Sequence, residues 1–460
     1  MKKIFFLTLT VILGFSDIYG QDYSTGLNFN DKKYESVLKK APLTRNLYTN
    51  LPSAYSLKKY TPVPKSQGQH GTCVGWSTAY AGMTILESIY KKRTDKTTIN
   101  ANTFSPGFVY KQIKNSKDVY CQLGSSISDA LNILKTKGVC KYNDITEINC
   151  PAFISPSVFS KASKYKIKDY AKIFSMFDSK EFKIAAVKKS ISQNNPVIIG
   201  MNTPKSFYTA TGEWTPVESS SLTYSGHAMC VIGYDNNKYG GAFEIMNSWG
   251  SQWGNKGYIW ISYENFTKFV KYAYEMITFK TAENKNNSFA GSVKIIQADG
   301  SESNVTFTDG IYKLDKPYKS GTLFRLYISN SQAAYVYAFG YDATKKTFTI
   351  FPYNKNISPA LNYAQNDVAI PDEDHYIQTD NTTGKDYLCI LYSKTKLNIE
   401  NIQSEIEKTY GSFSDRINYV LKDRLILPDE VEFSQKKMQF NVKNSKKNII
   451  ALIAETIHID

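Results

Sequence analysis

Apolar residues recur at helical spacing through much of the first half of the chain. They form one face over residues 73–93, directly after a turn rich in glycine. A second such face follows Ser126, whose Ser-Ile-Ser-Asp run has the form of a capping box, and it ends at Gly138. A third covers residues 181–193 and stops before Pro196. These patterns predict helices that pack their apolar faces against one another.

From residue 197 onwards, short apolar runs bounded by turn residues replace the helical spacing. Such runs are typical of buried β-strands. We expect strands at residues 197–200, 228–234, 242–246 and 258–262. A helical half followed by a strand-rich half predicts an α+β fold with two lobes and a cleft between them.

A polar stretch at residues 281–290 breaks this pattern and is interpreted as a linker. Beyond it we expect strands, a helical insertion at 399–421 and a strand-like tail at 442–459. The expected strands cover residues 324–328, 334–341, 347–353 and 386–392. Their aromatic residues alternate at period two, which is typical of core and cross-strand pairs. No catalytic set is found in this region.

The first 20 residues have the form of an export signal. Lys2 and Lys3 precede an apolar run over residues 4–15, which is too short to span a bilayer, and Gly20 suits a cleavage position. Residues 21–50 are polar and weakly patterned, which favours an N-terminal arm or a short pro-segment. We therefore expect an exported protein, located in the periplasm, at the cell surface or outside the cell, with no transmembrane segment.

Composition narrows the classes of partner. The chain has 460 residues, of which 42% are hydrophobic, enough for two or three packed domains. Its formal net charge of +15 favours anionic surfaces and polymers. The lysines are spread along the chain, however, and no nucleic-acid-binding motif is present. Nucleic acid is therefore not an expected partner.

The six cysteines are Cys73, Cys121, Cys140, Cys150, Cys230 and Cys389. Cys230 and Cys389 lie within strand-like runs and are interpreted as buried free thiols. Cys121, Cys140 and Cys150 could form one disulfide and leave one thiol over, in a pairing that sequence does not determine. No C-x-x-C motif or histidine pair accompanies them, so neither a metal nor another cofactor is expected.

Cys73 stands where a reactive cysteine is favoured. The N-terminus of a helix carries unpaired N–H groups and the positive end of the dipole, and both favour the thiolate. A thiolate needs an imidazole as proton acceptor, and the imidazole needs an orienting group. His227 begins the strand expected at 228–234, and Asn247 follows the strand expected at 242–246. Antiparallel pairing of these strands would place the two side by side.

Further residues complete this hypothetical site. The backbone N–H of Cys73 and the amide of Gln67 are candidate oxyanion donors. Trp249 is expected to cover the His–Asn hydrogen bond and to keep water out. The other histidines are given ordinary roles, His70 as a solvated loop residue and His375 and His458 as structural residues.

Three blocks of residues carry a resemblance to a known family. Gln67-Gly68…Gly71-Thr72-Cys73, Gly226-His227-Ala228 and the run from Asn247 to Tyr258 look like the signature blocks of papain-like (cathepsin-type) cysteine peptidases. The resemblance covers about residues 50–280 and is nearer to exported bacterial members. It implies Cys73 as nucleophile, His227 as base and acid, Asn247 as orienting group and Gln67 as oxyanion donor. It also implies that Gly124, Ser125, Ala228 and Trp249 contact substrate.

The sequence departs from the family at two places beside the nucleophile. The family usually has a cysteine three residues before it and an aromatic residue after it, and here these are His70 and Val74. The usual disulfide near the site is therefore absent or rerouted. His227 also lies slightly farther along the chain than usual, and residues 204–224 supply the extra length.

Together these features predict five regions. They are a signal peptide (1–20), an arm or pro-segment (21–50), a papain-like cysteine peptidase domain (51–280), a linker (281–290) and a β-rich accessory domain of unknown function (291–460). The expected function is that of an exported endopeptidase that hydrolyses protein or peptide substrates through a thioester. The alternatives are an envelope binding protein on a papain scaffold, and a transamidase or wall-peptide amidase using the same residues. The accessory domain is expected to bind an envelope component or another protein.

Overall fold

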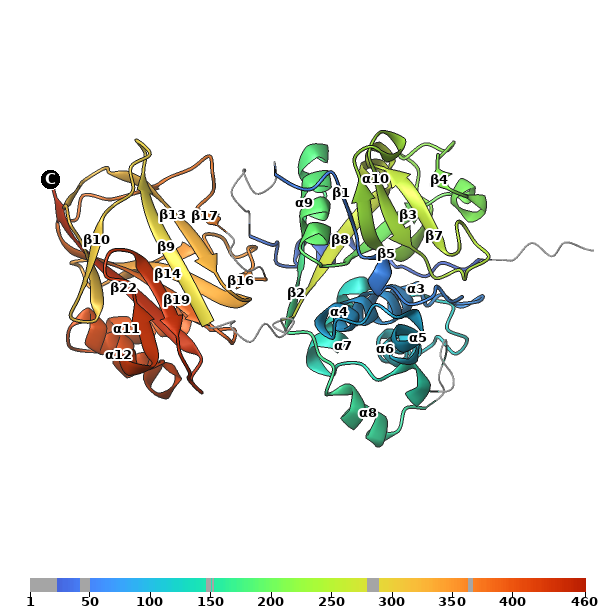
Figure 1. Ribbon diagram of the computed structural model, residues 1–460, viewed down its shortest axis with the longest axis horizontal. Helices are drawn as coiled ribbons and strands as arrows, with labels where there is room; N and C mark the ends of the chain where they lie inside the picture. Colours follow the sequence, from blue (N-terminus) through green and yellow to red (C-terminus); the bar gives the residue numbers. More distant parts are fainter. Residues whose placement is uncertain (1–22, 42–49, 146–149, 151–152, 279–288, 363–366) are drawn as a thin grey trace, which may run out of the picture.

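The computed structural model describes residues 23–41, 50–145, 150, 153–278, 289–362 and 367–460. The predicted signal peptide lies outside these ranges, as do residues 281–288 of the predicted linker. The chain forms two bodies side by side, one built from residues up to 278 and one from residue 289 onwards (Figure 1). No described helix is long and apolar enough to cross a lipid bilayer.

The helical lobe of the first body is centred on a continuous helical segment that starts at Cys73. It runs through α3 (Cys73–Gly75), the π-helical segment η2 (Trp76–Met83) and α4 (Thr84–Tyr90), which confirms the helix predicted at 73–93. The segment is almost entirely buried because other helices surround it. These helices are α5 (Lys96–Ala101), α6 (Pro106–Ile113), α7 (Ile127–Thr136) and α8 (Pro156–Ala162).

A close contact between α3 and α6 fixes the helical turn that carries Cys73. A Cβ atom at Gly75 would lie 2.5 Å from the carbonyl oxygen of Pro106, so only glycine permits this approach. Helix α6 is itself well capped, because Ser105 accepts the N–H of Phe108 and Pro106 occupies the first turn.

Helix α7 begins after Ser126 as predicted, but the predicted capping box does not form. The Ser126 hydroxyl hydrogen-bonds to that of Ser128 at 2.9 Å, and no side chain caps the helix. Asp129 instead forms a 2.5 Å ion pair with Lys33. The carboxylate of Asp129 therefore binds the N-terminal arm and does not cap the helix.

The β lobe is a sheet with the strand order β2-β8-β3-β5-β6-β7-β4, in which β1 also pairs with β5. The strands are β1 (Ala54–Ser56), β2 (Asp169–Lys172), β3 (Val197–Thr203), β4 (Glu213–Trp214), β5 (Ser225–Asp235), β6 (Ala242–Met246), β7 (Tyr258–Ser262) and β8 (Val270–Ile277). The four predicted strands are confirmed as β3, β5, β6 and β7. Helix α9 (Lys180–Ser192) packs on β5, and α10 (Tyr263–Phe269) leads directly into β8.

Strand β8 was not predicted, although it lies inside the sheet between β2 and β3. Lys271 and Glu275 interrupt its apolar run, and no turn residue separates it from α10. Glu275 is nevertheless buried, because Lys40 of the N-terminal arm pairs with it at 2.8 Å. The negative charge of Glu275, which interrupts the apolar pattern of the strand, is thus neutralised by Lys40, a residue far from it in sequence.

The second body is a β-sandwich with a helical layer. Its first sheet has the order β10-β11-β22-β19-β14-β15, and its second has the order β17-β13-β9-β21-β20. The first sheet consists of β10 (Val305–Thr308), β11 (Ile311–Leu314), β14 (Ala334–Tyr341), β15 (Thr347–Phe351), β19 (Gly384–Ser393) and β22 (Ile449–Ile459), with β12 (Tyr318–Lys319) and β16 (Ala360–Leu361) at its margins. The second consists of β9 (Phe289–Gln297), β13 (Leu323–Asn330), β17 (Val368–Ile370), β20 (Val431–Phe433) and β21 (Met438–Val442), with β18 (Ile377–Gln378) beside β13.

One sequence prediction for this body needs correction and another is confirmed. Phe289 and Ala290 belong to β9, so the strand begins within the predicted linker. The helical insertion expected at 399–421 is confirmed and consists of two helices, α11 (Ile399–Lys408) and α12 (Phe413–Leu421), because the chain turns at Gly411, whose φ is +106°. Both helices cover the outer face of the first sheet (Figure 1).

The N-terminal arm links the two bodies. After the short helix α1 (Asp31–Glu35), the N–H of Lys39 donates to the carbonyl of Asn356 at 2.6 Å, and the carbonyl of Lys39 accepts the N–H of Ser358 at 2.8 Å. Ala41 then enters the hydrophobic core of the sandwich. The arm is thus built into the accessory domain as well as into the first body.

Candidate active site

The nucleophile candidate lies at the first residue of a helix and faces the β lobe. The Cys73 side chain is fully buried, and its Sγ accepts the backbone N–H of Ala228 at 3.4 Å. The backbone N–H groups of Cys73 and Val74, which lie in the first turn where N–H groups have no partner within the helix, are directed at the same sulfur.

His227 and Asn247 are neighbours, as the strand argument predicted. Strands β5 and β6 pair antiparallel, and the Nε2 atom of His227 lies 2.7 Å from Oδ1 of Asn247. The same oxygen accepts the backbone N–H of Ser248 at 2.7 Å, which fixes the orientation of the amide. Nδ1 of His227 is buried and has no hydrogen-bond partner among the described residues. One ring nitrogen is therefore anchored and the other is left for a different task.

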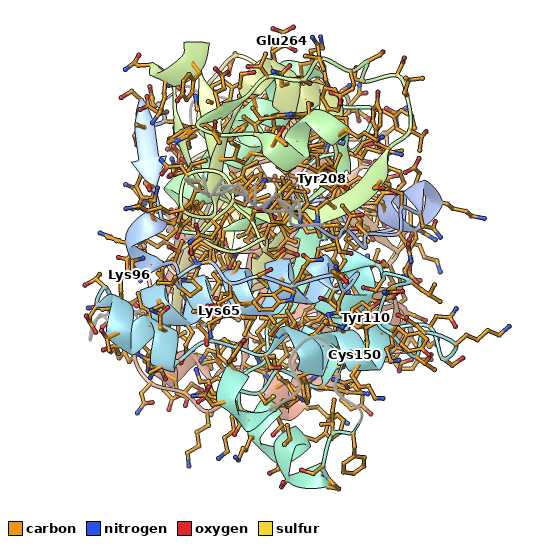
Figure 2. The ribbon with its side chains drawn as sticks, turned by 90° about the vertical axis from the view of Figure 1, so that its right-hand side faces the viewer. Lys65, Lys96, Tyr110, Cys150, Tyr208 and Glu264 are labelled. Atoms are coloured by element: carbon orange, nitrogen blue, oxygen red, sulfur yellow. A yellow bond between two sulfur atoms is a disulfide. The ribbon has the colours of Figure 1, made fainter. Side chains whose placement is uncertain are left out.

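Trp249 covers this pair of residues. Its ring stacks on that of His227 with centroids 4.6 Å apart and an interplanar angle of 24°. Phe207, Tyr208 and Trp253 pack around the indole in turn. In Figure 2, Tyr208 lies in the strand-rich half of the domain, and Tyr110 and Cys150 lie in the helical half. The aromatic cluster keeps water away from the hydrogen bond between His227 and Asn247.

The side chain of Gln67 is held from both ends of its amide. Its Oε1 accepts the hydroxyl of Ser248 at 2.6 Å, and its Nε2 donates to the carbonyl of His70 at 2.7 Å. The prediction that His70 is a solvated loop residue needs correction. Its side chain is half-buried, and its Nδ1 is shielded from solvent without a hydrogen-bond partner in the described ranges. The turn packs against the loop at Cys121, whose carbonyl accepts the N–H of Gly71.

Burial keeps the two candidate catalytic groups uncharged in this structure. It raises the pKa of the Cys73 thiol from about 9.0 to about 12, although hydrogen bonds from backbone N–H groups oppose this shift. Burial likewise lowers the pKa of His227 from 6.5 to about 4, against the opposing effect of Asn247. At neutral pH the site therefore holds a thiol and a neutral imidazole, and the wide separation of the two pKa values disfavours proton transfer while both groups are buried.

The N-terminal arm lies across the site. The N–H groups of Gly26 and Leu27 both donate to the carbonyl of Gly226, at 3.1 and 2.9 Å. On the helical side, the N–H of Ser125 donates to the carbonyl of Gly26 at 2.8 Å, and the carbonyl of Ser125 accepts the N–H of Asn28 at 2.9 Å. These contacts bridge the two lobes through backbone groups alone.

The arm also contacts the aromatic cluster. Nε1 of Trp249 donates to the carbonyl of Ser24 at 2.8 Å, and the ring of Tyr23 stacks on the indole at 4.9 Å. A Cβ atom at Gly26 would lie 2.1 Å from the carbonyl oxygen of Gly71, so the arm fits here only because this residue is glycine. The arm is thus an extended peptide seated beside Cys73.

The predicted substrate-contacting residues are distributed around this peptide. Ser125 and Trp249 hydrogen-bond to the arm, and Gly124 approaches it so closely that a Cβ atom would lie 2.5 Å from the carbonyl oxygen of Gly26. Ala228 uses its N–H on the Cys73 sulfur instead. Sequence reasoning missed Gly226, although it lies in a signature block, because its contribution is a backbone carbonyl.

A disulfide supports the loop that carries Gly124 and Ser125. Cys121 is bonded to Cys150, which leaves Cys140 as the remaining thiol of the three. Asp118 adds to this support, since it accepts the hydroxyl of Tyr110 at 2.7 Å and the N–H of Gln122 at 2.8 Å. The predictions that Cys230 and Cys389 are buried free thiols are confirmed.

Comparison with known proteins agrees with this geometry. Residues 52–278 match the family model described as "Papain family cysteine protease", and residues 317–396 match a "Domain of unknown function (DUF4384)". The fold, the site and the first match identify residues 52–278 as a papain-family cysteine protease domain, and hence the chain as a cysteine-type peptidase, a hydrolase of peptide bonds.

Individual relatives share the same part of the chain. An uncharacterized peptidase C1-like protein of Acanthamoeba polyphaga mimivirus is 27% identical over 252 residues, covering 51% of this chain and 76% of that protein. A cysteine protease of Blomia tropicalis is 24% identical over 253 residues, covering 53% and 72%. Among solved structures, xylellain, a cysteine protease from Xylella fastidiosa, is similar with a TM-score of 0.44 and 20% identity, covering 56% of this chain and 97% of that one.

Proposed function

We propose that the chain is an exported endopeptidase whose catalytic residues are Cys73, His227, Asn247 and Gln67. The observation that carries this proposal is the 2.7 Å contact between Nε2 of His227 and Asn247, which leaves Nδ1 without a partner. The residue after His227 reaches the Cys73 sulfur through its N–H. An imidazole anchored at one nitrogen beside a thiol is what proton transfer from that thiol requires.

The reaction follows from these positions. Nδ1 of His227 accepts the thiol proton, and the thiolate of Cys73 attacks the peptide carbonyl carbon. The developing oxyanion accepts hydrogen bonds from the N–H of Cys73 and the amide of Gln67. The imidazolium of His227 protonates the leaving amine, and a water molecule deprotonated by the same imidazole hydrolyses the thioester. Asn247 keeps the ring in place throughout.

The docked arm supports endopeptidase rather than exopeptidase specificity. Residues 23–28 cross the cleft as an extended segment that contacts both lobes. The chain continues beyond this segment into α1, whose Asp31 accepts the hydroxyl of Tyr272 at 2.5 Å. A substrate chain can therefore extend past the site on the side where the arm leads into α1.

The same contacts support the interpretation of residues 21–50 as a short pro-segment. The arm occupies the backbone partners that a substrate would use, and it seals Cys73 and His227 from water. Displacing the arm would rehydrate both groups, which moves the pKa of the thiol down and that of the imidazole up. The covered protein is then latent, and the uncovered protein is active.

Export rests on the sequence of residues 1–20, with their charged start and short apolar run. Fractionation of cells that produce the chain with a C-terminal tag tests this part. The tag should appear outside the cytoplasm, and changing Lys2 and Lys3 to glutamate should retain it inside. Retention of the unmodified chain in the cytoplasm would contradict export.

A thiol-directed epoxide inhibitor and casein test the chemistry. Under reducing conditions the mature protein with Gly26→Leu, a change that displaces the arm because a Cβ atom there would lie 2.1 Å from the carbonyl oxygen of Gly71, should bind the inhibitor and cleave casein, and adding Cys73→Ala should abolish both. Cys230→Ala is the matched control, since Cys230 is a buried thiol on β5 with no part in the site. Products analysed by mass spectrometry with an added amine should be acids. Amide products would favour the transamidase alternative, and no reaction at all would favour the scaffold alternative.

A further inference from the structure

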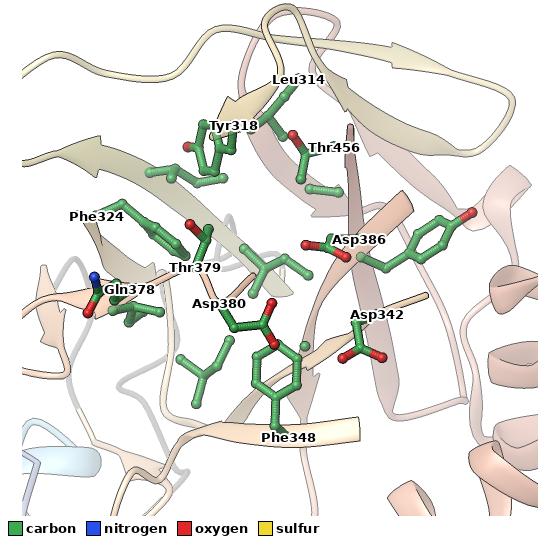
Figure 3. Close-up of a pocket in the computed structure, with 17 residues that line it drawn as sticks. Leu314, Tyr318, Phe324, Asp342, Phe348, Gln378, Thr379, Asp380, Asp386 and Thr456 are labelled. Atoms are coloured by element: carbon green, nitrogen blue, oxygen red, sulfur yellow. The ribbon is translucent and has the colours of Figure 1, made fainter. Parts of the chain in front are cut away.

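A cavity of about 250 Å³ opens at one end of the accessory sandwich, and every residue that lines it belongs to the second body. It lies between the two sheets, with walls from β9, β13 and β18 on one side and β14, β15, β19 and β22 on the other. Figure 3 shows the side chains that surround it. Nothing in the peptidase chemistry makes use of this space.

Strand register explains why the cavity exists. Gly340, Leu388 and Ala454 lie side by side in one row across β14, β19 and β22. The next row inward, Ala338, Ile390 and Leu452, belongs to the buried core. Two small residues in the outer row leave the space between the sheets unfilled.

An aromatic ring forms one wall. Phe348 is paired with Gly340 across β14 and β15, and a Cβ atom at Gly340 would lie 2.1 Å from the phenyl ring. The ring therefore lies over the glycine, and 49% of Phe348 remains exposed at the rim. Tyr318 and Phe324 stand across the cavity from it (Figure 3). Aromatic faces at a partly open site suit a cation or an apolar stem.

A carboxyl group with an unused oxygen projects into the same space. Oδ2 of Asp386 lies 3.0 Å from Nδ1 of His458, whereas Oδ1 is buried and has no hydrogen-bond partner among the described residues. The hydroxyl of Thr456, which is paired with Asp386 across β19 and β22, is buried and unpartnered in the same way. An acceptor and a hydroxyl without partners beside an apolar cavity indicate a ligand with hydrogen-bond donors.

The position of Asp386 is fixed from behind. The ring of His458 is buried, and its Nε2 hydrogen-bonds to the hydroxyl of Ser320 at 3.1 Å. His458 is thus a positioning residue that holds the carboxyl group at the cavity wall. Two further carboxyl groups, those of Asp342 and Asp380, line the opening (Figure 3).

The charge of the lining selects the ligand class. Among the described residues that line the cavity, there are three carboxyl groups and no lysine or arginine. This is notable in a chain whose formal net charge is +15. The carboxyl groups of Asp342 and Asp380 each accept an N–H within their own turns, from Thr344 and Thr382. They add negative potential, and Asp386 offers the direct partner.

We propose that this cavity binds an organic cation, an alkylammonium or alkylguanidinium group on a short apolar stem. The cationic head would hydrogen-bond to Oδ1 of Asp386 and to Thr456, and the stem would pack against Leu388, Phe324 and the Phe348 ring. A bare metal ion fits poorly, because Ca²⁺ and Mg²⁺ need about six or more oxygen ligands and most of the lining is carbon. The group can come from a free amine or from a lysine or arginine side chain of a partner protein.

Calorimetry on the full mature chain carrying Cys73→Ala tests this proposal without proteolysis. The probes are pentylamine, agmatine and the uncharged isostere pentanol, together with a peptide blocked at both ends that contains one central lysine. Pentylamine and agmatine should bind at millimolar concentrations or below, and pentanol should bind at least about tenfold more weakly because it lacks the charge-assisted hydrogen bond. Binding of the peptide as well would identify a protein side chain as the source, and its failure would identify a free amine.

Substitutions in the cavity lining test whether the amine binds beside Asp386. Asp386→Asn should weaken amine binding at least about tenfold, and Ala454→Leu should abolish it by filling the cavity. The control is Asp423→Asn, an exposed residue after α12 that should leave binding unchanged. If Asp386→Asn fails to fold, Thr456→Val and Ala454→Leu take its place. The proposal is overturned if no amine binds, if pentanol binds as tightly as pentylamine, or if folded variants bind like the parent chain.

Discussion

The described chain contains two buried histidines, His227 in the peptidase cleft and His458 in the accessory domain, and they differ in what their ring nitrogens contact. His458 uses both nitrogens, on Asp386 and on Ser320. His227 uses one, on Asn247, and leaves the other without a partner. A fully bonded imidazole is a structural support, whereas a half-bonded imidazole beside a thiol can transfer a proton. Burial alone does not distinguish the two roles.

The anchors of the two rings differ as well. The anchor of His458 is the carboxyl group of Asp386, whereas Asn247 orients the ring of His227 without adding a charge. Accordingly, burial prevails at His227 and lowers its pKa to about 4. The catalytic candidate is therefore held as a neutral base until the cleft opens.

Replacing each histidine by alanine should give the largest contrast. His227→Ala should lower kcat/KM for a peptide substrate by roughly 10²–10⁴-fold, because general acid–base catalysis is lost. His458→Ala should leave kcat/KM of the folded protein nearly unchanged. It should lower the melting temperature, because the half-buried carboxyl group of Asp386 loses its histidine partner. Steady-state kinetics and thermal unfolding measure the two effects. Equal losses of activity in both folded variants would remove the distinction.

Replacing the residues that anchor the two histidines, Asn247 and Asp386, should give a smaller contrast in activity. Asn247→Ala should lower kcat by about 10- to 100-fold, because the ring loses a hydrogen bond that is strengthened when the imidazole is charged. Asp386→Asn, its counterpart in the accessory domain, should leave kcat unaltered. Single-turnover acylation rates give the cleanest readout. A normal rate in Asn247→Ala would show that Trp249 and the backbone suffice to orient His227.

The N-terminal arm should affect only the peptidase site. Gly26→Leu puts a side chain where a Cβ atom would lie 2.1 Å from the carbonyl oxygen of Gly71, so the arm should be displaced. We expect epoxide labelling of the full chain to accelerate about tenfold, the equivalent of losing one or two backbone hydrogen bonds. Lys32→Leu, an exposed position on α1, is the control. Unchanged labelling in Gly26→Leu would argue against a latent form.

Acid should loosen the arm to a smaller extent through Glu35. Burial alone would raise the pKa of this carboxyl, but Lys172, the N–H of Met176 and Ser175 outweigh it and hold the pKa below its usual value. The stabilisation is therefore present above the pKa of an unfolded glutamate, about 4.3, and is lost as the pH falls through the lower folded value. Hydrogen exchange at residues 26–28 should show protection decreasing several-fold below about pH 4. Glu35→Gln should have less protection at neutral pH and a flatter response to acid.

Sequence reasoning found the groups that act through side chains within local patterns. Cys73, His227 and Asn247 each lie at the end of a clear helix or strand, and antiparallel pairing of adjacent strands was enough to bring two of them together. The arm could not be placed, because Gly26 and Leu27 bind through backbone groups that carry no side-chain signature. The cavity depends on the mutual register of β14, β19 and β22, which are far apart in sequence.

Errors of prediction arose where distant residues altered a local rule. The local pattern predicts a capping box at Asp129, but this carboxylate pairs with Lys33. Glu275 interrupts the apolar pattern of a strand because it is charged, and its partner Lys40 lies near the other end of the domain in sequence. In both cases a lysine of the N-terminal arm supplies the positive charge that pairs with the carboxylate. An ionic partner brought in by tertiary structure cannot be read from the segment that it stabilises.

Mapping of the epoxide adduct by mass spectrometry tests the central claim most directly. The full mature chain with Gly26→Leu should acquire one adduct, located on Cys73, and the same chain with His227→Ala added should label far more slowly. Cys140, Cys230 and Cys389 should remain unmodified because all three are buried away from the cleft. An adduct on one of these three, or a labelling rate that does not depend on His227, would contradict the assignment of Cys73 and His227 as the reacting pair.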